Sequence, residues 1–181
     1  EDQLLEMTRA GNKFSGWTYS EVILALPGDS KEKHMKTVLK LADSGMESIC
    51  MYQCMILVGS ELGSNNSKQR WKMGTKFRVL PGQYGAYDFG GKEILCAEIE
   101  EICVTTESLA LADYYECRSF ALTEGLFYQD RILIELYKFL ENFEIKASDL
   151  LPILHNNRHK FSEKLTSLYS SFDNDTKTEL W

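Results

Sequence analysis

Residues 22–26 constrain the fold of this chain more than any other stretch. They read Val-Ile-Leu-Ala-Leu, a continuous apolar run between the polar residues before it and Pro27-Gly28 after it. A run this short, bounded by turn residues, is typical of a strand that is buried on both faces. Pro27 and Gly28 predict a sharp turn directly after the strand.

A helix and a second strand are predicted after this turn. Asp29 or Ser30 can cap the helix, and Glu32 lies in its first turn, where the helix dipole favours a negative charge. The apolar side chains that follow are three and four residues apart, as on one helix face: Met35, Val38, Leu39 and Ala42. Residues 43–45 predict the end of the helix, and residues 48–57 predict a strand. This order makes a right-handed unit of two parallel strands joined by a helix.

The same region resembles the fifth and sixth strands of radical S-adenosylmethionine enzymes. That family often reads Asp-x-Ile-x-Gly-x-Pro-Gly-Glu-Thr, where residues 21–30 here read Glu-Val-Ile-Leu-Ala-Leu-Pro-Gly-Asp-Ser. Residues 52–62, Tyr-Gln-Cys-Met-Ile-Leu-Val-Gly-Ser-Glu-Leu, resemble the sixth strand and its Pro-Gly-Thr-x-Leu ending. The departures from the family pattern are Ala25 for Gly, Asp29 and Ser30 for Glu and Thr, and Val58 for Pro.

The resemblance implies an α/β chain taken from the C-terminal part of such an enzyme. The Cys-x-x-x-Cys-x-x-Cys motif that holds the family's 4Fe–4S cluster normally precedes this region, and the chain does not contain it. Residues 1–62 would form a partial, half βα barrel with parallel strands. Residues 63–106 would be an irregular segment with short strands, and residues 107–181 a helical C-terminal bundle.

A cofactor pocket is implied at the C-terminal ends of the two strands. By resemblance, Ile23, Ala25, Tyr52 and Cys54 would flank the adenosyl group of S-adenosylmethionine. In the parent enzyme a reduced 4Fe–4S cluster cleaves this cofactor to a 5′-deoxyadenosyl radical, which abstracts hydrogen from the substrate. The C-terminal part is similar to the tails of radical enzymes with a cobalamin domain, so cobalamin is a further candidate cofactor upstream.

The chain alone is expected to be noncatalytic, with no catalytic residue and no metal ligand of its own. It would form part of the pocket wall and a substrate-side cap, and would bind none of these cofactors tightly. Its partners would be the remainder of the parent enzyme and an unidentified substrate. The alternative is a noncatalytic interaction module whose helical half binds a protein partner.

Charge and cysteine content narrow the function classes. A formal net charge of −7 disfavours a general nucleic-acid binder, which needs a basic surface. The chain has no run of about 18 apolar residues, so no membrane span is expected. An odd count of 5 cysteines without a visible signal peptide favours reduced thiols in the cytoplasm.

Two pairs of potential metal ligands occur in the sequence, and neither pair is predicted to bind a metal ion. Cys50 and Cys54 fall in a predicted strand, where four residues span about 13 Å, too far apart for one metal site. His155 and His159 would share a helix face, but zinc needs a third ligand and none is evident. His34 is predicted to be solvated.

The middle of the chain predicts only short strands. Residues 76–80 alternate charged and apolar side chains, and Pro81-Gly82 is expected to end that strand. Residues 83–91, which hold three aromatic side chains among three glycines, predict an ordered loop over an apolar surface, or a lid. Residues 102–106 favour a strand, whereas the residues just before them fit a strand or a helix equally well.

Four helices are predicted after residue 107, with Ser108 as the first cap and a fraying tail from residue 173.

If the chain is part of a barrel, the strand at residues 22–26 or the strand at residues 50–57 has lost a neighbouring strand. An unpaired apolar strand edge tends to bind other strands. We therefore expect that edge to pair with a second copy of the chain, giving a homo-oligomer, or with residues 102–106 of its own chain.

Overall fold

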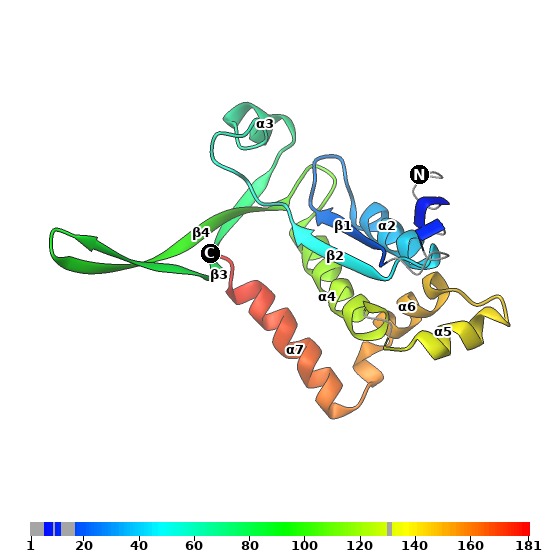
Figure 1. Cartoon of the computed structure of the whole chain (residues 1–181). Helices are drawn as coiled ribbons and strands as arrows, with labels where there is room; N and C mark the ends of the chain where they lie inside the picture. Colours follow the sequence, from blue (N-terminus) through cyan, green and yellow to red (C-terminus); the bar gives the residue numbers. More distant parts are fainter. Residues whose placement is uncertain (1–5, 9, 12–16, 130–131) are drawn as a thin grey trace.

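The computed structural model of the chain describes residues 6–8, 10–11, 17–129 and 132–181. The protein is a mixed α/β chain with a small parallel sheet, a long antiparallel hairpin and a set of helices packed beside the parallel sheet (Figure 1). No helix in the described ranges is both long enough and apolar enough to cross a membrane.

The predicted strand–helix–strand unit is confirmed. Strand β1 (Tyr19–Leu24), helix α2 (Lys31–Asp43) and strand β2 (Ser48–Gln53) follow one another, and the two strands are parallel, in register from Tyr19↔Ser48 to Leu24↔Gln53. Ser30 is the N-cap, and its hydroxyl accepts a hydrogen bond from the Lys33 backbone N–H. The first strand starts and ends earlier than the apolar run predicts, because residues 25–28 already belong to the turn.

The residues just after β2 pair with strand β4 (Lys92–Thr105) instead of continuing the parallel sheet. The N–H of Ile56 donates to the Glu101 carbonyl at 2.8 Å, and the N–H of Cys103 donates to the Cys54 carbonyl at 2.9 Å. These bonds join residues 54–56 to residues 101–103, at the end of the edge for which the sequence predicts pairing with a second copy or with residues 102–106. They tie the parallel sheet to the hairpin.

Strand β3 (Gly74–Phe89) and β4 form the hairpin, and here two predictions are wrong. Pro81 and Gly82 do not end the first strand; the register shifts between Val79 and Tyr84, and the pairing then continues to Phe89↔Lys92. Residues 83–91 are therefore the outer part of a hairpin, not a loop over an apolar surface. The outer hairpin projects away from the helices (Figure 1), and all residues from Lys92 to Ile99 are exposed.

The helices are α3 (Asn65–Arg70), α4 (Leu111–Phe127), α5 (Ile134–Glu141), α6 (Ala147–Asn156) and α7 (Glu163–Thr178), with a 3₁₀ turn, η2 (Arg158–Lys160), before α7. The helical turn expected near Lys68 is confirmed as α3, and the four C-terminal helices are confirmed. The α4 cap is not Ser108 but Ala110. The Ser108 hydroxyl instead donates a hydrogen bond to the Asp29 carbonyl, 79 residues earlier.

The tail does not fray as expected. Helix α7 reaches Thr178, and the Leu180 side chain is buried in the core between β4 and α4. Trp181 exchanges two backbone hydrogen bonds of 3.0 Å with Phe77 of β3. The polar sequence of residues 173–179 is helical because its apolar end is anchored.

Two apolar clusters form the core. The first gathers residues of β1, β4 and α4 around Ala25, Ile102 and Tyr114. The second lies between α2, β2, α4 and α6, around Val38, Ile49 and Phe120. Helix α2 contributes Met35 to both clusters, so the C-terminal helices pack directly against the strand–helix–strand unit.

Candidate functional site

One face of the β1–β2 sheet is open in the described part of the chain. Val22, Ile49 and Met51 on the other face pack into the cluster beneath α2 and α4. Because side chains alternate between faces along a strand, the open face is formed by Tyr19, Glu21, Ile23, Cys50 and Tyr52. The exposed fractions are 62% for Tyr19, 42% for Ile23 and 52% for Tyr52. We call this set the open face.

The structure brings two of the four predicted cofactor residues together. Ile23 and Tyr52 are register partners, so their side chains are neighbours on the open face, one residue before the strand ends. Ala25 and Cys54 are instead buried in the first core cluster, with 0% and 2% exposure. Their side chains pack against the core, and the Cys54 backbone is already engaged with Leu24 and Cys103.

The backbone at Ala25 is unusual. Its φ of +70° lies in the left-handed region, which glycine adopts easily and alanine rarely. This is the position at which the radical S-adenosylmethionine pattern commonly has glycine. At this position the chain has an alanine in a backbone conformation that is usually adopted by glycine.

The turn after β1 is held by contacts to distant elements. The N–H of Asp29 donates to the Leu26 carbonyl at 3.0 Å, and the Lys33 ammonium donates to the Gly28 carbonyl at 3.0 Å. The hydroxyl of Ser108 fixes the Asp29 carbonyl from the segment before α4. The turn at the end of β1 is thus rigidly positioned beside the open face.

His34 contradicts the prediction of a solvated histidine. Its side chain is 1% exposed, and its Nδ1 lies 3.6 Å from Asp29 Oδ2. Burial lowers the pKa of His34, although the nearby Asp29 carboxylate opposes the shift. The imidazole is therefore a neutral group packed under the turn.

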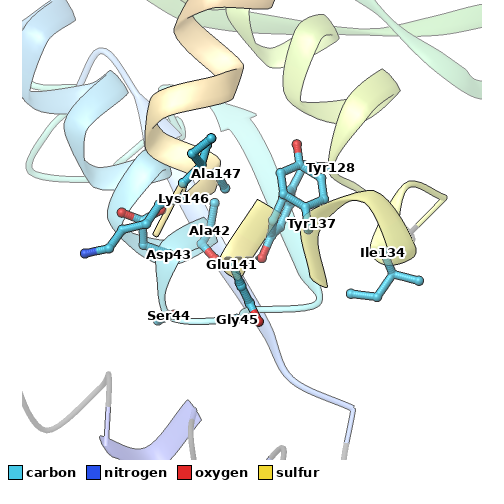
Figure 2. Close-up of a pocket in the computed structure, with 11 residues that line it drawn as sticks. Ala42, Asp43, Ser44, Gly45, Tyr128, Ile134, Tyr137, Glu141, Lys146 and Ala147 are labelled. Atoms are coloured by element: carbon cyan, nitrogen blue, oxygen red, sulfur yellow. Dashed lines mark hydrogen bonds between the residues drawn. The ribbon is translucent and has the colours of Figure 1, made fainter. Parts of the chain in front are cut away.

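A cavity of about 320 Å³ lies between the end of α2, helix α5 and the start of α6 (Figure 2). Asp43 Oδ1 accepts from the Ser148 N–H at 2.9 Å, and the Tyr128 hydroxyl is shared between the carbonyls of Ala42 and Met46. Burial raises the pKa of Tyr137 to about 12, so this phenol stays neutral. Asp43 thus joins α2 to α6, and Tyr128, at the end of α4, joins that helix to the end of α2. None of these groups is placed to activate a nucleophile.

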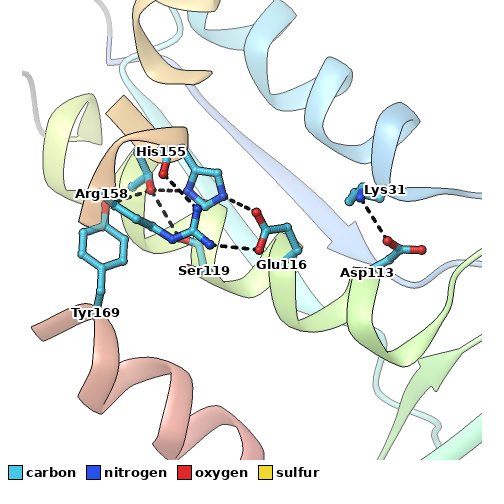
Figure 3. A network of polar contacts seen from close by, with 8 residues as sticks. Lys31, Asp113, Glu116, Ser119, His155, Arg158 and Tyr169 are labelled. Atoms are coloured by element: carbon cyan, nitrogen blue, oxygen red, sulfur yellow. Dashed lines mark hydrogen bonds and ion pairs between the residues drawn. The ribbon is translucent and has the colours of Figure 1, made fainter. Parts of the chain in front are cut away.

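A buried polar network joins α4, α6, η2 and α7 (Figure 3). His155 Nε2 lies 2.9 Å from Glu116 Oε1, and His155 Nδ1 lies 2.8 Å from Thr123 Oγ1. The Tyr169 hydroxyl is 2.8 Å from the same Thr123 oxygen. A carboxylate only accepts, so Nε2–H donates to Glu116, and Nδ1 accepts from Thr123.

Burial and neighbouring charges shift the pKa values of His155 and Glu116. Arg158 Nη2 donates to Glu116 Oε2 at 3.1 Å, and Arg158 Nη1 donates to the His155 carbonyl at 2.8 Å. Burial and the Arg158 charge lower the pKa of His155. Burial alone would raise the pKa of Glu116, but the hydrogen bond from His155 and the Arg158 charge lower it. Thr123 is 0% exposed, so the network resembles a hydrolytic triad only in its residue types and serves to join helices.

We expect stability to fall as the pH drops below 6.5. His34 and His155 both have a folded-state pKa below the ordinary value of 6.5, so the unfolded state binds more protons in that window. Glu116 adds a further loss below its ordinary value of 4.5. Urea unfolding at about pH 7.5 and about pH 5.5 measures the difference in free energy.

A variant without the His155 imidazole checks the source of this pH dependence. His155→Gln should reduce the difference in stability between the two pH values, because one of the two histidines with a lowered pKa is removed. Stability that stays constant or rises between the two pH values would contradict the expected result.

The described residues contain no group of three or more His, Cys, Asp or Glu side chains that could hold a metal ion. Cys54, Cys103 and Cys117 are buried, and burial raises the pKa of Cys103 and Cys117 to about 12. His155 and His159 are on separate elements, because α6 ends at Asn156. The buried thiols are therefore protonated core residues.

Comparison with models of known protein families and with curated proteins finds no match for this chain. A proposal of function therefore depends on the geometry of the open face and of the turn at Ala25.

Proposed function

We propose that the chain is the C-terminal part of a radical S-adenosylmethionine enzyme, and that its open face lines the cofactor pocket. The observation that carries the proposal is the pair Ile23 and Tyr52, which are neighbours on an uncovered face of a parallel sheet, near its C-terminal edge. Parallel sheets in α/β proteins are covered on both faces, and their ligands lie at the C-terminal strand ends.

The edge of the sheet supports a half barrel. The β1–β2 sheet has two strands, and the outer edge of β1 carries no other strand of the described residues. A barrel closes by adding strands at such an edge, and the open face then becomes its interior. In this proposal the strands of the upstream part of the enzyme pair with β1.

Chemistry also agrees with an adenosyl group on the open face. Tyr52 and Ile23 offer a flat ring and a branched aliphatic side chain, on which a purine can lie. The left-handed backbone at Ala25 matches the glycine of the family pattern. The described residues contain no cluster of metal ligands, so the cysteines that hold the 4Fe–4S cluster belong upstream in this proposal.

The division of labour in the parent enzyme follows from these features. The bound cofactor and cluster supply the radical that abstracts hydrogen from the substrate. This chain holds the adenosyl group between the open face and the turn after β1. The side chains of Ile23 and Tyr52 exclude water from this side of the adenosyl group. A cobalamin domain upstream belongs to the same proposal.

The test uses the full-length protein from the same gene, reconstituted anaerobically with iron and sulfide. We expect Tyr52→Ala to weaken S-adenosylmethionine binding about tenfold, because aromatic contact contributes roughly 1–2 kcal/mol. Calorimetric titration measures the affinity. Tyr84→Ala is the matched control, since Tyr84 is also an exposed tyrosine but lies on the hairpin, and it should bind normally.

Two outcomes would overturn the proposal. One is a full-length sequence without a Cys-x-x-x-Cys-x-x-Cys motif before this region. The other is a cluster-loaded protein in which Tyr52→Ala and Tyr84→Ala bind the cofactor equally well. Either result would favour the noncatalytic interaction module. The isolated chain should bind S-adenosylmethionine with a Kd weaker than about 1 μM, because most of the pocket would be missing.

A further inference from the structure

Arg118 of α4 is a half-buried arginine with no ion pair in the described part of the chain. Its Nε is buried without a hydrogen-bond acceptor, and no carboxylate of the described residues forms an ion pair with its guanidinium. The nearby Glu179 is instead paired with Arg78, whose Nη1 lies 3.5 Å from Glu179 Oε1. A buried N–H normally has an acceptor, because it is costly to leave unpaired. The Arg118 Nε is therefore available to an acceptor from outside the described residues.

Arg118 lies on the wall of an open cavity of about 300 Å³ between β2, α4 and α7. The cavity is mainly apolar, and its side chains come from three elements: Ile49, Met51, Ala121, Leu122 and Phe172. The Arg118 Cζ lies 5.3 Å from the centre of the Phe172 ring, which fixes the guanidinium at the cavity wall by a cation–π contact.

Two polar side chains close to these elements in the chain also have unused hydrogen-bonding atoms. Both amide atoms of Gln53 are buried without a partner among the described residues. Gln53 follows Ile49 and Met51 on the same face of β2. The Tyr114 hydroxyl is likewise buried without a hydrogen bond to the described residues, and Tyr114 precedes Arg118 by one helical turn.

We propose that this cavity binds a small amphipathic monocarboxylate, with its carboxylate on Arg118 and its apolar body along Ile49, Met51 and Phe172. Arginine forms two parallel hydrogen bonds with a carboxylate, and most of the remaining wall is apolar. Glu124 also lines the cavity, so a single negative charge suits the site better than a phosphate dianion. The site is on the face of the sheet opposite to the open face and does not depend on the proposed function.

Calorimetric titration of the whole chain with sodium octanoate tests the site, below the micelle-forming concentration. Octylammonium, octan-1-ol and octyl phosphate, which share its apolar chain, are the comparison ligands. We expect octanoate to bind at one site, and the three others to bind at least about tenfold more weakly, because a charged hydrogen bond contributes roughly 1.5–3 kcal/mol.

Arg118→Gln should weaken octanoate binding at least about tenfold, for the same reason. Arg70→Gln is the matched control, because Arg70 also lies over an aromatic ring, 4.9 Å from Trp71, but lines neither cavity. It should leave octanoate binding unchanged.

A second variant blocks the site without touching Arg118. Gly125 lines the cavity, and a Cβ at this position would meet no atom within 4 Å, so Gly125→Leu adds a side chain at the cavity wall without a clash at Cβ. We expect this variant to lose octanoate binding and to keep its thermal midpoint. The proposal is overturned if octanoate does not bind, if octan-1-ol binds equally well, or if Gly125→Leu still binds octanoate normally.

Discussion

Replacing Thr123 with valine should lower the free energy of unfolding by about 2–4 kcal/mol, because valine keeps the shape but leaves two buried polar groups without a partner. The Thr123 hydroxyl links His155 Nδ1 and the Tyr169 hydroxyl, at 2.8 Å from each. Both side chains are nearly inaccessible to water, with 3% exposure for His155 and 4% for Tyr169. Water therefore cannot replace the lost contacts cheaply.

Thr37→Val is the matched control for this loss. Both hydroxyls lie near the carbonyl four residues earlier, at 2.9 Å from Lys33 O for Thr37 and at 3.3 Å from Ser119 O for Thr123. Thr37 is exposed, however, and is not part of a buried network. Its replacement should change stability by less than about 0.5 kcal/mol. Urea unfolding followed by circular dichroism measures both variants. Equal losses at Thr37 and Thr123 would show that the network contributes nothing beyond helix propensity.

Local patterns carried the parts of the fold that depend on neighbouring residues. The apolar run at residues 22–26, the turn after it and the cap at Ser30 predict the strand–helix–strand unit because each signal lies within a few residues of the feature. The same holds for α3 and the four C-terminal helices. The resemblance to radical S-adenosylmethionine enzymes predicted Ile23 and Tyr52 as cofactor residues. They lie 29 residues apart in the sequence and are register neighbours in the structure.

Features that depend on distant pairing could not be predicted in this way. Pro81 and Gly82 are strong turn signals, yet the hairpin absorbs them as a shift in register, because β4 offers a continuous partner on both sides of them. The tail from residue 173 is polar, and it is held by contacts with distant residues, among them the pairing of Trp181 with Phe77 and the burial of Leu180. His34 is buried because the turn at Asp29 closes over it, which its own helix pattern does not reveal.

The buried polar network and the cavity at Arg118 also depend on residues that are distant in the sequence. Glu116 and His155 are 39 residues apart, and Thr123 and Tyr169 are 46 apart, so no spacing rule connects them. The cavity at Arg118 combines residues of β2, α4 and α7. A helix pattern identifies Arg118 only as a charged residue, and its lack of an ion pair with the described residues becomes visible when the elements are packed.

The left-handed conformation at Ala25 leads to the second large effect. Ala25→Val should destabilise the chain by about 2–4 kcal/mol, because a β-branched side chain is strained at positive φ and overpacks a filled site. Ala25 has a φ of +70° and 0% exposure, so both penalties apply. Chemical denaturation measures the loss.

Glycine at the same position separates backbone strain from packing. Ala25→Gly should stay within about 1 kcal/mol of the original chain, because relief of roughly 1–2 kcal/mol of strain offsets the lost methyl group and the greater freedom of the unfolded chain. Ala42→Gly is the matched control, since Ala42 is a buried alanine, 4% exposed, within helix α2. That change should cost about 1–2 kcal/mol. An equal loss at both positions would mean that the backbone at Ala25 is not left-handed, and would remove its agreement with the glycine of the radical enzyme pattern.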